Sequence, residues 1–185
     1  MIIIGITGTL GAGKGTIVDF LKEKGFLHFS ARDFIVETIE KEGLEVNRDS
    51  MTLIGNRLRE EHSPSYIIES LYQRAKESGQ NSIIESVRNP KEVEFLRQKE
   101  DFLLIAVDAQ IKIRYQRILQ RKSSTDNVSF ETFKQNEERE MQSNDVNAQN
   151  LKSCIEKADI VVDNSGTIED LKQKIEEIWK KINKK

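Results

Sequence analysis

The most constraining feature of the sequence is a glycine cluster that directly follows an apolar run. Residues 2–7 read Ile-Ile-Ile-Gly-Ile-Thr and are mostly β-branched and apolar. The next nine read Gly-Thr-Leu-Gly-Ala-Gly-Lys-Gly-Thr, and residues 17–21 have a helical pattern. Glycines let the backbone turn tightly and bring its N–H groups to phosphate oxygens, and the following helix N-terminus favours negative charge. The order strand, glycine loop, lysine and helix predicts a phosphate-binding loop in which Lys14 reaches the β- and γ-phosphates of a nucleotide. The residues expected to bind that nucleotide are Gly8, Thr9, Gly11, Ala12, Gly13, Lys14, Gly15 and Thr16.

The rest of the chain alternates short apolar runs with longer amphipathic stretches, which is typical of a parallel sheet covered by helices. Strands are expected at 2–7, 26–29, 82–86, 102–108 and 160–163, and most of these runs are apolar enough for burial on both faces. Pro64 and Pro90 each follow a cap residue and are expected at the first position of a helix, and Thr167 with Asp170 is expected to begin the last helix. With 185 residues and no linker, the chain is expected to form one domain over 1–185.

Charge and composition narrow the function classes. The chain has 29 basic and 31 acidic residues, so no bulk positive field favours nucleic acid as a partner. The single cysteine, Cys154, excludes an internal disulfide framework, and no apolar run is long enough to span a membrane. We therefore expect a cytoplasmic protein without membrane or nucleic-acid partners, as a monomer or a small homo-oligomer.

The phosphate loop carries a family resemblance. The residue after the lysine is Gly15, and the hydroxyl comes one step later at Thr16. This Gly-x-Gly-Lys-Gly-Thr pattern resembles the loop of adenylate kinase and related nucleoside monophosphate kinases. The segment Glu85-Ser86-Val87-Arg88 resembles their Asp-Gly-Phe-Pro-Arg segment, with Glu85 in place of the aspartate. The resemblance implies ATP and Mg²⁺ as cofactors, Thr16 and Glu85 as metal-site residues, and Arg88 as an arginine that binds the acceptor phosphate and acts in catalysis.

The acceptor side matches the same kinases less completely. Residues 29–34 lie where those kinases have a segment that lines the acceptor site, and Asp33 matches that segment. Val36 stands where a second arginine is expected, so Arg32, Arg57 or Arg59 is expected to supply the missing charge. We expect an acceptor-binding insertion at about 30–78, with Arg32, Asp33, Arg57 and Arg88 as substrate-binding residues.

A second group of arginines is expected to stabilise the transferring phosphoryl group. Arg114, Arg117 and Arg121 are spaced to share one helix face, and the resemblance assigns Arg117, Arg121 and Arg139 to catalysis around a lid at 122–150. The alternative is a solvated helix face paired with Glu137 and Glu138. Closure of such a lid would exclude water from the reaction.

The C-terminal part resembles dephospho-coenzyme A kinases, in which the loop after the last strand lies against adenine. Asn164, Ser165 and Gly166 are therefore expected at an adenine pocket, although a plain strand-to-helix turn explains them as well. Taken together, we expect an α/β protein with the three-layer P-loop NTPase fold: a five-stranded parallel sheet flanked by helices, plus a mobile helical lid. The expected activity is transfer of the γ-phosphoryl group of ATP to a nucleoside or deoxynucleoside monophosphate. The alternatives are a dephospho-coenzyme A kinase and a non-catalytic ATP-binding regulator.

Overall fold

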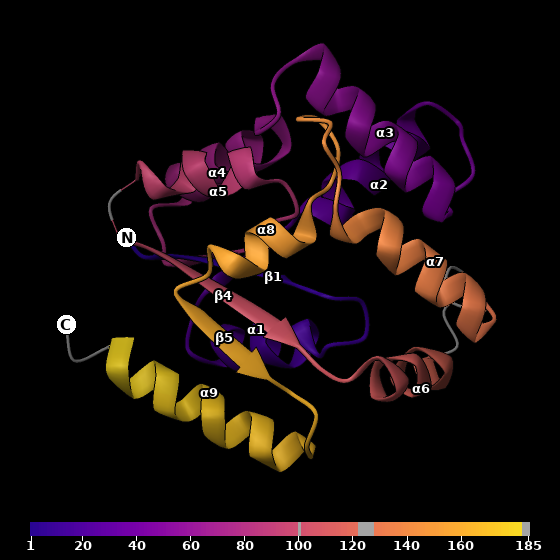
Figure 1. Ribbon diagram of the computed structural model, residues 1–185. Helices are drawn as coiled ribbons and strands as arrows, with labels where there is room; N and C mark the ends of the chain where they lie inside the picture. Colours follow the sequence, from indigo (N-terminus) through magenta and orange to yellow (C-terminus); the bar gives the residue numbers. More distant parts are fainter. Residues whose placement is uncertain (100, 122–127, 183–185) are drawn as a thin grey trace.

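Five parallel strands form one sheet at the centre of the computed structural model, which describes residues 1–99, 101–121 and 128–182 (Figure 1). The strands lie in the order β2-β3-β1-β4-β5. Their bounds are β1 Ile3–Gly8, β2 Leu27–Ser30, β3 Ser82–Glu85, β4 Phe102–Asp108 and β5 Ile160–Asp163. All five expected strands are present within one or two residues of the expected ends. The α/β class and the parallel sheet are confirmed.

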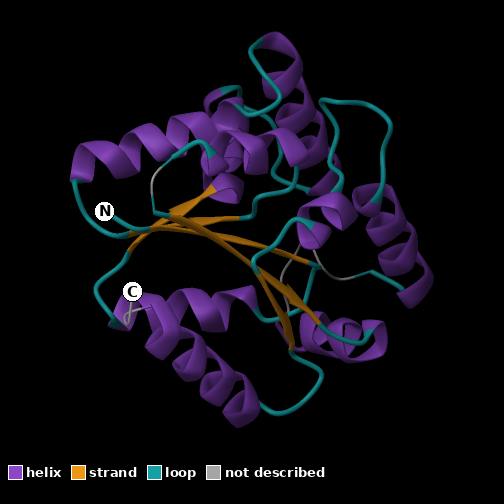
Figure 2. Ribbon diagram, turned by 60° about the vertical axis from the view of Figure 1, so that its left-hand side comes forward, coloured by secondary structure: helices purple, strands orange, loops and turns teal. Residues whose placement is uncertain are grey.

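Helices connect the strands and cover both faces of the sheet (Figure 2). Their bounds are α1 Lys14–Glu23, α2 Ala31–Lys41, α3 Arg48–Glu61, α4 Tyr66–Ser78, α5 Pro90–Arg97, α6 Ile111–Arg121, α7 Phe130–Met141, α8 Leu151–Glu156 and α9 Ile168–Ile182. None of the helices in the described ranges combines the length and the apolar character that a membrane crossing requires.

Alternate residues of β1 divide the core into two layers. Ile4 and Ile6 point into a cluster with α1 and α9, whereas Ile3 points into a second cluster with α4, α5 and α8. Both layers are visible in Figure 1, with α1 and α9 below the sheet and α4, α5 and α8 above it. Because side chains alternate across a strand, a continuous apolar run such as 2–6 fills both layers at once.

Local signals set most helix ends. Asn89 caps α5 in a capping box with Glu92, and Pro90 is the first residue of the helix, as expected. The Oγ1 of Thr167 accepts from the N–H of Asp170, and the Asp170 carboxylate accepts from the N–H of Thr167, so the expected start of α9 is confirmed. The expectation for Pro64 was wrong by two residues: Pro64 lies in a turn, and α4 begins at Tyr66 after Ser65.

The strand order places the candidate site at one edge. Central β1 pairs with β3 on one side and with β4 on the other, so the loops after these strands meet at the carboxyl edge of the sheet. This reversal of strand order is where open parallel sheets bind ligands. The expected insertion at 30–78 contains α2, α3 and α4. Of the expected lid, residues 122–127 lie outside the described residues, and the remainder contains α7.

Candidate functional site

The loop between β1 and α1 has a shape that requires glycine at three positions, of which Gly8 and Gly13 have the closest neighbouring atoms. Gly8 has a φ of 135°, and a Cβ there would lie 2.0 Å from the carbonyl oxygen of Val107. Gly13 has a φ of 99°, and a Cβ there would lie 2.4 Å from Nδ2 of Asn164. Side chains are excluded at both positions by the positive φ and by the neighbouring atoms. Gly15, in contrast, faces open space, so the loop is unobstructed where α1 begins.

Lys14 is the first residue of α1 and its side chain folds back over the loop. Its Nζ donates hydrogen bonds to the carbonyl oxygens of Gly8 and Thr9, each at 2.9 Å. Burial, followed by the charge of Arg88, lowers the pKa of Lys14 from 10.5 to about 7, while Glu85 acts in the opposite direction. An anion placed beside this ammonium group would favour its charged form.

Two polar contacts from neighbouring segments hold the loop in place. Thr9 Oγ1 donates to Oδ1 of Asp108 at 2.6 Å, and Asn164 Nδ2 donates to the carbonyl oxygen of Ala12 at 2.7 Å. Asp108 is the last residue of β4, and Asn164 directly follows β5. The two strands that lie on this side of β1 thus each provide one of the hydrogen bonds to the loop. The Thr9 hydroxyl and the Ala12 carbonyl group are thereby held in place, and these two contacts shape the loop.

A cavity of about 870 Å³ lies beside this loop, bordered by α1, α2, α3, α6 and α7. Eleven of the expected site residues line it: Gly11, Gly13, Lys14, Gly15, Thr16, Arg32, Glu85, Arg88, Arg117, Arg121 and Asn164. Eight lie outside its lining: Gly8, Thr9, Ala12, Asp33, Arg57, Arg139, Ser165 and Gly166. The lining carries seven cationic and three acidic side chains, so it is suited to polyanionic ligands.

Glu85 lines the cavity at the end of β3. Its Oε2 lies 3.0 Å from Nε2 of His28 on β2, a partner that the apolar run around His28 gave no reason to expect. Burial alone would raise the pKa of Glu85, but the hydrogen bond from His28 and the charge of Lys14 lower it below its usual range. An ionised carboxylate and the hydroxyl of Thr16 in one cavity are oxygen donors of the kind that Mg²⁺ accepts, so the residues fit this ion.

Arg88 is already paired on the opposite side of the cavity. Its Nη1 donates to Oε2 of Glu140 at 2.6 Å and to Oε1 of Gln149 at 3.0 Å. Glu140 also accepts from Arg48 at 2.8 Å. Burial would raise the pKa of Glu140, but Arg88 and Arg48 together hold it below its usual range. This bridge joins α7 to α3 and to the segment before α5.

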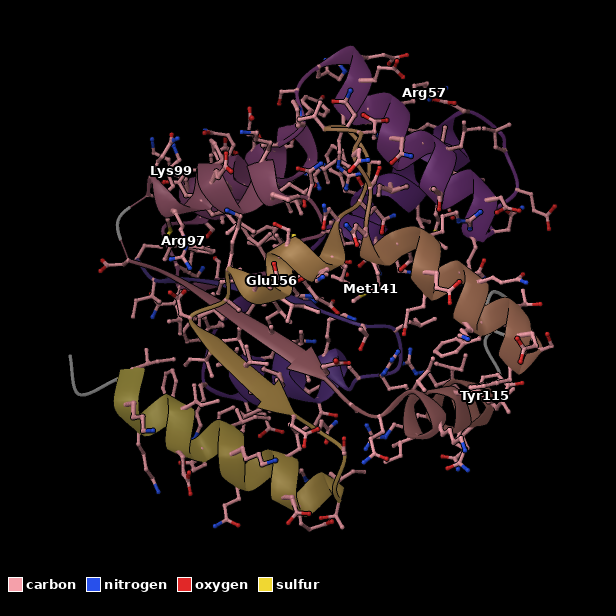
Figure 3. All side chains as sticks on the ribbon, in the orientation of Figure 1. Arg57, Arg97, Lys99, Tyr115, Met141 and Glu156 are labelled. Atoms are coloured by element: carbon pink, nitrogen blue, oxygen red, sulfur yellow. The ribbon has the colours of Figure 1, made fainter. Side chains whose placement is uncertain are left out.

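The arginines of α6 divide between two roles. Arg117 and Arg121 line the cavity, and Arg117 donates from Nη2 to the carbonyl oxygen of Gly166 at 3.2 Å. Arg114 instead pairs with Glu137, the partner that the alternative named, but it is buried and so does not belong to a solvated helix face. Tyr115 extends from α6 (Figure 3), and its ring packs edge-to-face against Phe130 of α7, which joins the two helices.

Three expected residues are engaged elsewhere. Asp33 lies in the first turn of α2, which Ser30 caps by accepting from its backbone N–H. Arg57 pairs with Glu42 on the outer surface of α3 (Figure 3). Arg139 is exposed, and its nearest carboxylate is Asp49 at 3.5 Å.

Arg48, Arg59, Glu140 and Gln149 line the cavity but were not among the residues assigned to the site from sequence. Arg59 had been one of three open alternatives for an acceptor-side charge. For the others, the only available signal was position: Glu140 is next to the expected lid arginine, and Arg48 begins a charged helix. Which neighbour faces inward depends on the tertiary placement of α3 and α7.

Comparison with known proteins shows the family to which the chain belongs. The sequence matches the AAA domain model over residues 4–142. A UPF0200 protein of Sulfurisphaera tokodaii is 30% identical over 182 residues, which cover 97% of each chain. A UPF0200/UPF0201 protein of Archaeoglobus fulgidus is 30% identical over 190 residues, and the present chain spans 57% of its length.

Solved structures of kinases share the fold. Shikimate kinase from Acinetobacter baumannii, in complex with shikimate, superposes with a TM-score of 0.58 at 18% identity, over 96% of this chain and 92% of that one. Dephospho-CoA kinase from Campylobacter jejuni superposes with a TM-score of 0.50 at 15% identity, over 97% and 96%. These likenesses confirm the P-loop kinase-like fold that the loop and sheet indicate. Since the family model covers most of the sequence and a UPF0200 relative matches almost end to end, the chain belongs to the AAA domain family and to the UPF0200 proteins.

Proposed function

We propose that the chain is an ATP-dependent small-molecule kinase that transfers the γ-phosphoryl group of ATP to a nucleotide-like acceptor. The observation that carries the proposal is the cavity itself. Its lining joins a glycine loop with Lys14 to cationic side chains from α2, α3 and the segment after β3. Such a cavity can hold a phosphoryl donor and a charged acceptor next to each other, which is the positioning that phosphoryl transfer requires.

On the donor side, the loop amides and Lys14 would bind the phosphates of ATP. Arg117 and Arg121 line the same cavity from α6 and would stabilise the charge that spreads over the transferring group. Within the described residues, Nη1 of Arg117 is buried and has no hydrogen-bond partner, which leaves it for a ligand. Asn164, with Ser165 and Gly166 behind it, would border the adenine.

Thr16 and Glu85 would hold Mg²⁺. When bound, the ion neutralises phosphate charge and orients the phosphates for transfer. His28 would keep the Glu85 carboxylate in place through its 3.0 Å hydrogen bond. Residues 122–150 are proposed as the lid that excludes water, so that the phosphoryl group is not lost to hydrolysis.

A nucleoside or deoxynucleoside monophosphate is the favoured acceptor. Gly15 and Arg88 follow the nucleoside monophosphate kinase pattern, and Arg32 and Arg88 both line the acceptor side. Dephospho-coenzyme A is the second candidate because the segment after β5 resembles that of the corresponding kinases, and a protein with that name is among the structural neighbours.

The test is acceptor-dependent ADP formation. Purified protein is incubated with ATP and Mg²⁺ and with one acceptor at a time: a panel of ribo- and deoxyribonucleoside monophosphates, dephospho-coenzyme A, shikimate and no acceptor. A rate that rises at least tenfold above the no-acceptor rate with one compound supports the proposal and identifies the acceptor class. Equal ADP formation in all tubes would indicate an ATPase, and saturable ATP binding without turnover would indicate an ATP-binding regulator.

A further inference from the structure

Arg59 is the most deeply buried cation that borders the cavity. It lies on α3, and its side chain is 2% exposed. Its Nε donates to Oε1 of Glu92 on α5 at 3.0 Å, and the Glu92 side chain is 0% exposed. A buried charge pair of this kind holds the guanidinium group in one place.

Glu92 pairs with only one nitrogen of that guanidinium group in the described part of the chain. Its other oxygen, Oε2, accepts from the backbone N–H groups of Arg88 at 2.8 Å and of Asn89 at 3.0 Å. The carboxylate thus closes the cap of α5 with one oxygen and fixes Arg59 with the other. Glu92 orients Arg59 through Nε alone and leaves its terminal amino groups to other acceptors.

The Nη1 group of Arg59 is a donor without an acceptor. Among the residues that the structure describes, this atom is buried and makes no hydrogen bond. Buried donors in native proteins are almost always paired, so an unpaired one at the wall of a cavity calls for an explanation. A ligand oxyanion is suitable because guanidinium groups bind such groups with two parallel hydrogen bonds.

A glycine lies directly beside Nη1. Gly55 lies in the interior of α3, where glycine weakens a helix relative to alanine. A Cβ on Gly55 would lie 3.5 Å from Nη1 of Arg59 and 3.2 Å from Cδ1 of Ile35. Ile35 and Met51 line the cavity on this side and supply an apolar wall, and Arg32 adds a second cation.

Arg88 is less available than Arg59 to bind an acceptor phosphate. Its Nη1 is bound by both Glu140 and Gln149, so an acceptor would have to compete with a buried carboxylate. Among the described residues, nothing accepts a hydrogen bond from Nη1 of Arg59. Arg59 is therefore the acceptor-side cation that a carboxylate fixes in place and that still has a free terminal donor.

We propose that Arg59 is the principal binding residue for a phosphate monoester group of the acceptor, whose body packs against Ile35 and Met51. Glu92 acts as a positioning residue, and the absence of a side chain at Gly55 leaves room for the Nη1 group to turn toward the ligand. The inference rests on the proposed function for the identity of the site as an acceptor site. The binding of a phosphate monoester at Arg59 can be measured without any turnover.

The experiment measures binding of methyl phosphate by calorimetry, in the presence of Mg²⁺ and a saturating non-hydrolysable ATP analogue that fills the phosphate loop. Wild-type protein is expected to bind methyl phosphate and to bind acetate more weakly. Arg59→Lys keeps the charge next to Glu92 but removes the planar guanidinium group that can donate two parallel hydrogen bonds. This change is expected to weaken methyl phosphate binding at least about tenfold. Gly55→Ala leaves both Arg59 and Glu92 intact and is expected to cause a similar loss by filling the space beside Nη1. Arg74→Lys, a surface change on α4, is the matched control and is expected to bind as wild type does.

Thermal unfolding of each variant shows whether it is folded, and Gly55→Ala tests the site even where Arg59→Lys fails to fold. Unchanged binding in both variants, no binding by wild type, or tighter binding of acetate would each overturn the inference. The kinase assay separates the two proposals. Methyl phosphate binding that depends on Arg59 without any acceptor-dependent ADP formation would remove the proposed function and leave the binding site. Acceptor-dependent turnover with an unchanged acceptor KM in Arg59→Lys would support the proposed function and remove the binding role of Arg59.

Discussion

The donor side and the acceptor side of the cavity are formed by different chemical groups. The donor side is backbone: a loop whose glycines bring N–H and carbonyl groups into place, with Lys14 bound to the loop's own carbonyl oxygens. The acceptor side is made of side chains from segments far apart in the sequence, such as Arg59 with Glu92 and Arg88 with Glu140. Backbone geometry is set locally and tolerates few substitutions, whereas a side-chain network can be rearranged by single changes. The donor side should therefore be sensitive to the shape of a residue and the acceptor side to its charge.

The largest effect is expected from Gly8→Ala. The added Cβ would lie 2.0 Å from a carbonyl oxygen of β4, so strand or loop must move, and we expect the free energy of unfolding to fall by about 4 kcal/mol or more. Gly15→Ala is the matched control, because open space surrounds that position, and its effect should be within about 0.5 kcal/mol. Urea denaturation of both variants measures the difference. Equal stability of the two variants would show that the loop is not shaped by backbone packing.

Lys14→Ala tests whether the donor side takes part in the phosphoryl-transfer reaction. The side chain bonds only to loop carbonyl groups, so the fold should tolerate its loss, but removal of one charge-stabilising donor is expected to lower kcat by about 10²–10³. The measurement is acceptor-dependent ADP formation, with circular dichroism as the check on folding. Full activity in a folded Lys14→Ala protein would contradict the role given to this residue.

Glu140→Gln tests the acceptor side for charge. The carboxylate bridges Arg88 and Arg48, and we expect the change to lower the free energy of unfolding by about 2 kcal/mol at pH 7. Because the folded-state pKa of Glu140 is lowered, its contribution is complete above the unfolded value of 4.5 and is lost as the pH falls through the folded value. Wild type should thus lose more stability than Glu140→Gln on acidification.

The control for that comparison is Glu138→Gln on the same helix, where the carboxylate is exposed and faces Lys134 at 3.9 Å. Thermal unfolding of the three proteins at several pH values from neutral to acidic gives the slopes. If Glu138→Gln flattens the pH dependence as much as Glu140→Gln does, the buried bridge is not its source.

Asn164→Ala is expected to have the smallest effect. It removes the 2.7 Å hydrogen bond to Ala12 and leaves that carbonyl oxygen without this donor, at a cost of about 1 kcal/mol in stability. ATP affinity should fall by about fivefold, the same energy expressed as binding. Calorimetric titration with an ATP analogue measures it. A loss of a hundredfold or more would mean that Asn164 bonds the nucleotide directly rather than through the loop.

The contrast between the two sides also decides what could be predicted from sequence. The phosphate loop is a contiguous motif, and apolar runs such as 102–108 fill both core layers, so the loop and the five strands could be recognised locally. The start of α4 could not, because Pro64 suits a turn as well as a first helical position, and Glu69 bonds to both Ser63 and Ser65.

The acceptor side was less predictable for a geometric reason. Arg57 and Arg59 are two residues apart on α3 and so point in nearly opposite directions, one to Glu42 at the surface and the other to Glu92 in the core. Arg139 and Glu140 are adjacent on α7, about 100° apart around the helix axis, and Arg139 is exposed whereas Glu140 is buried. Residue type suggested arginines as ligands, but only the placement of each helix shows which one faces the cavity.

The double role of Glu92 restricts how the sequence of this protein can evolve. One carboxylate closes the cap of α5 and fixes the arginine on α3, so a substitution at position 92 would disturb a helix end and a binding residue together. Substitution at position 59 would in turn leave a buried charge without its partner. The two positions are expected to be inherited as a pair, and lineages that adopt a different acceptor should exchange both or neither. An alignment of relatives sorted by substrate would then show positions 59 and 92 changing in step.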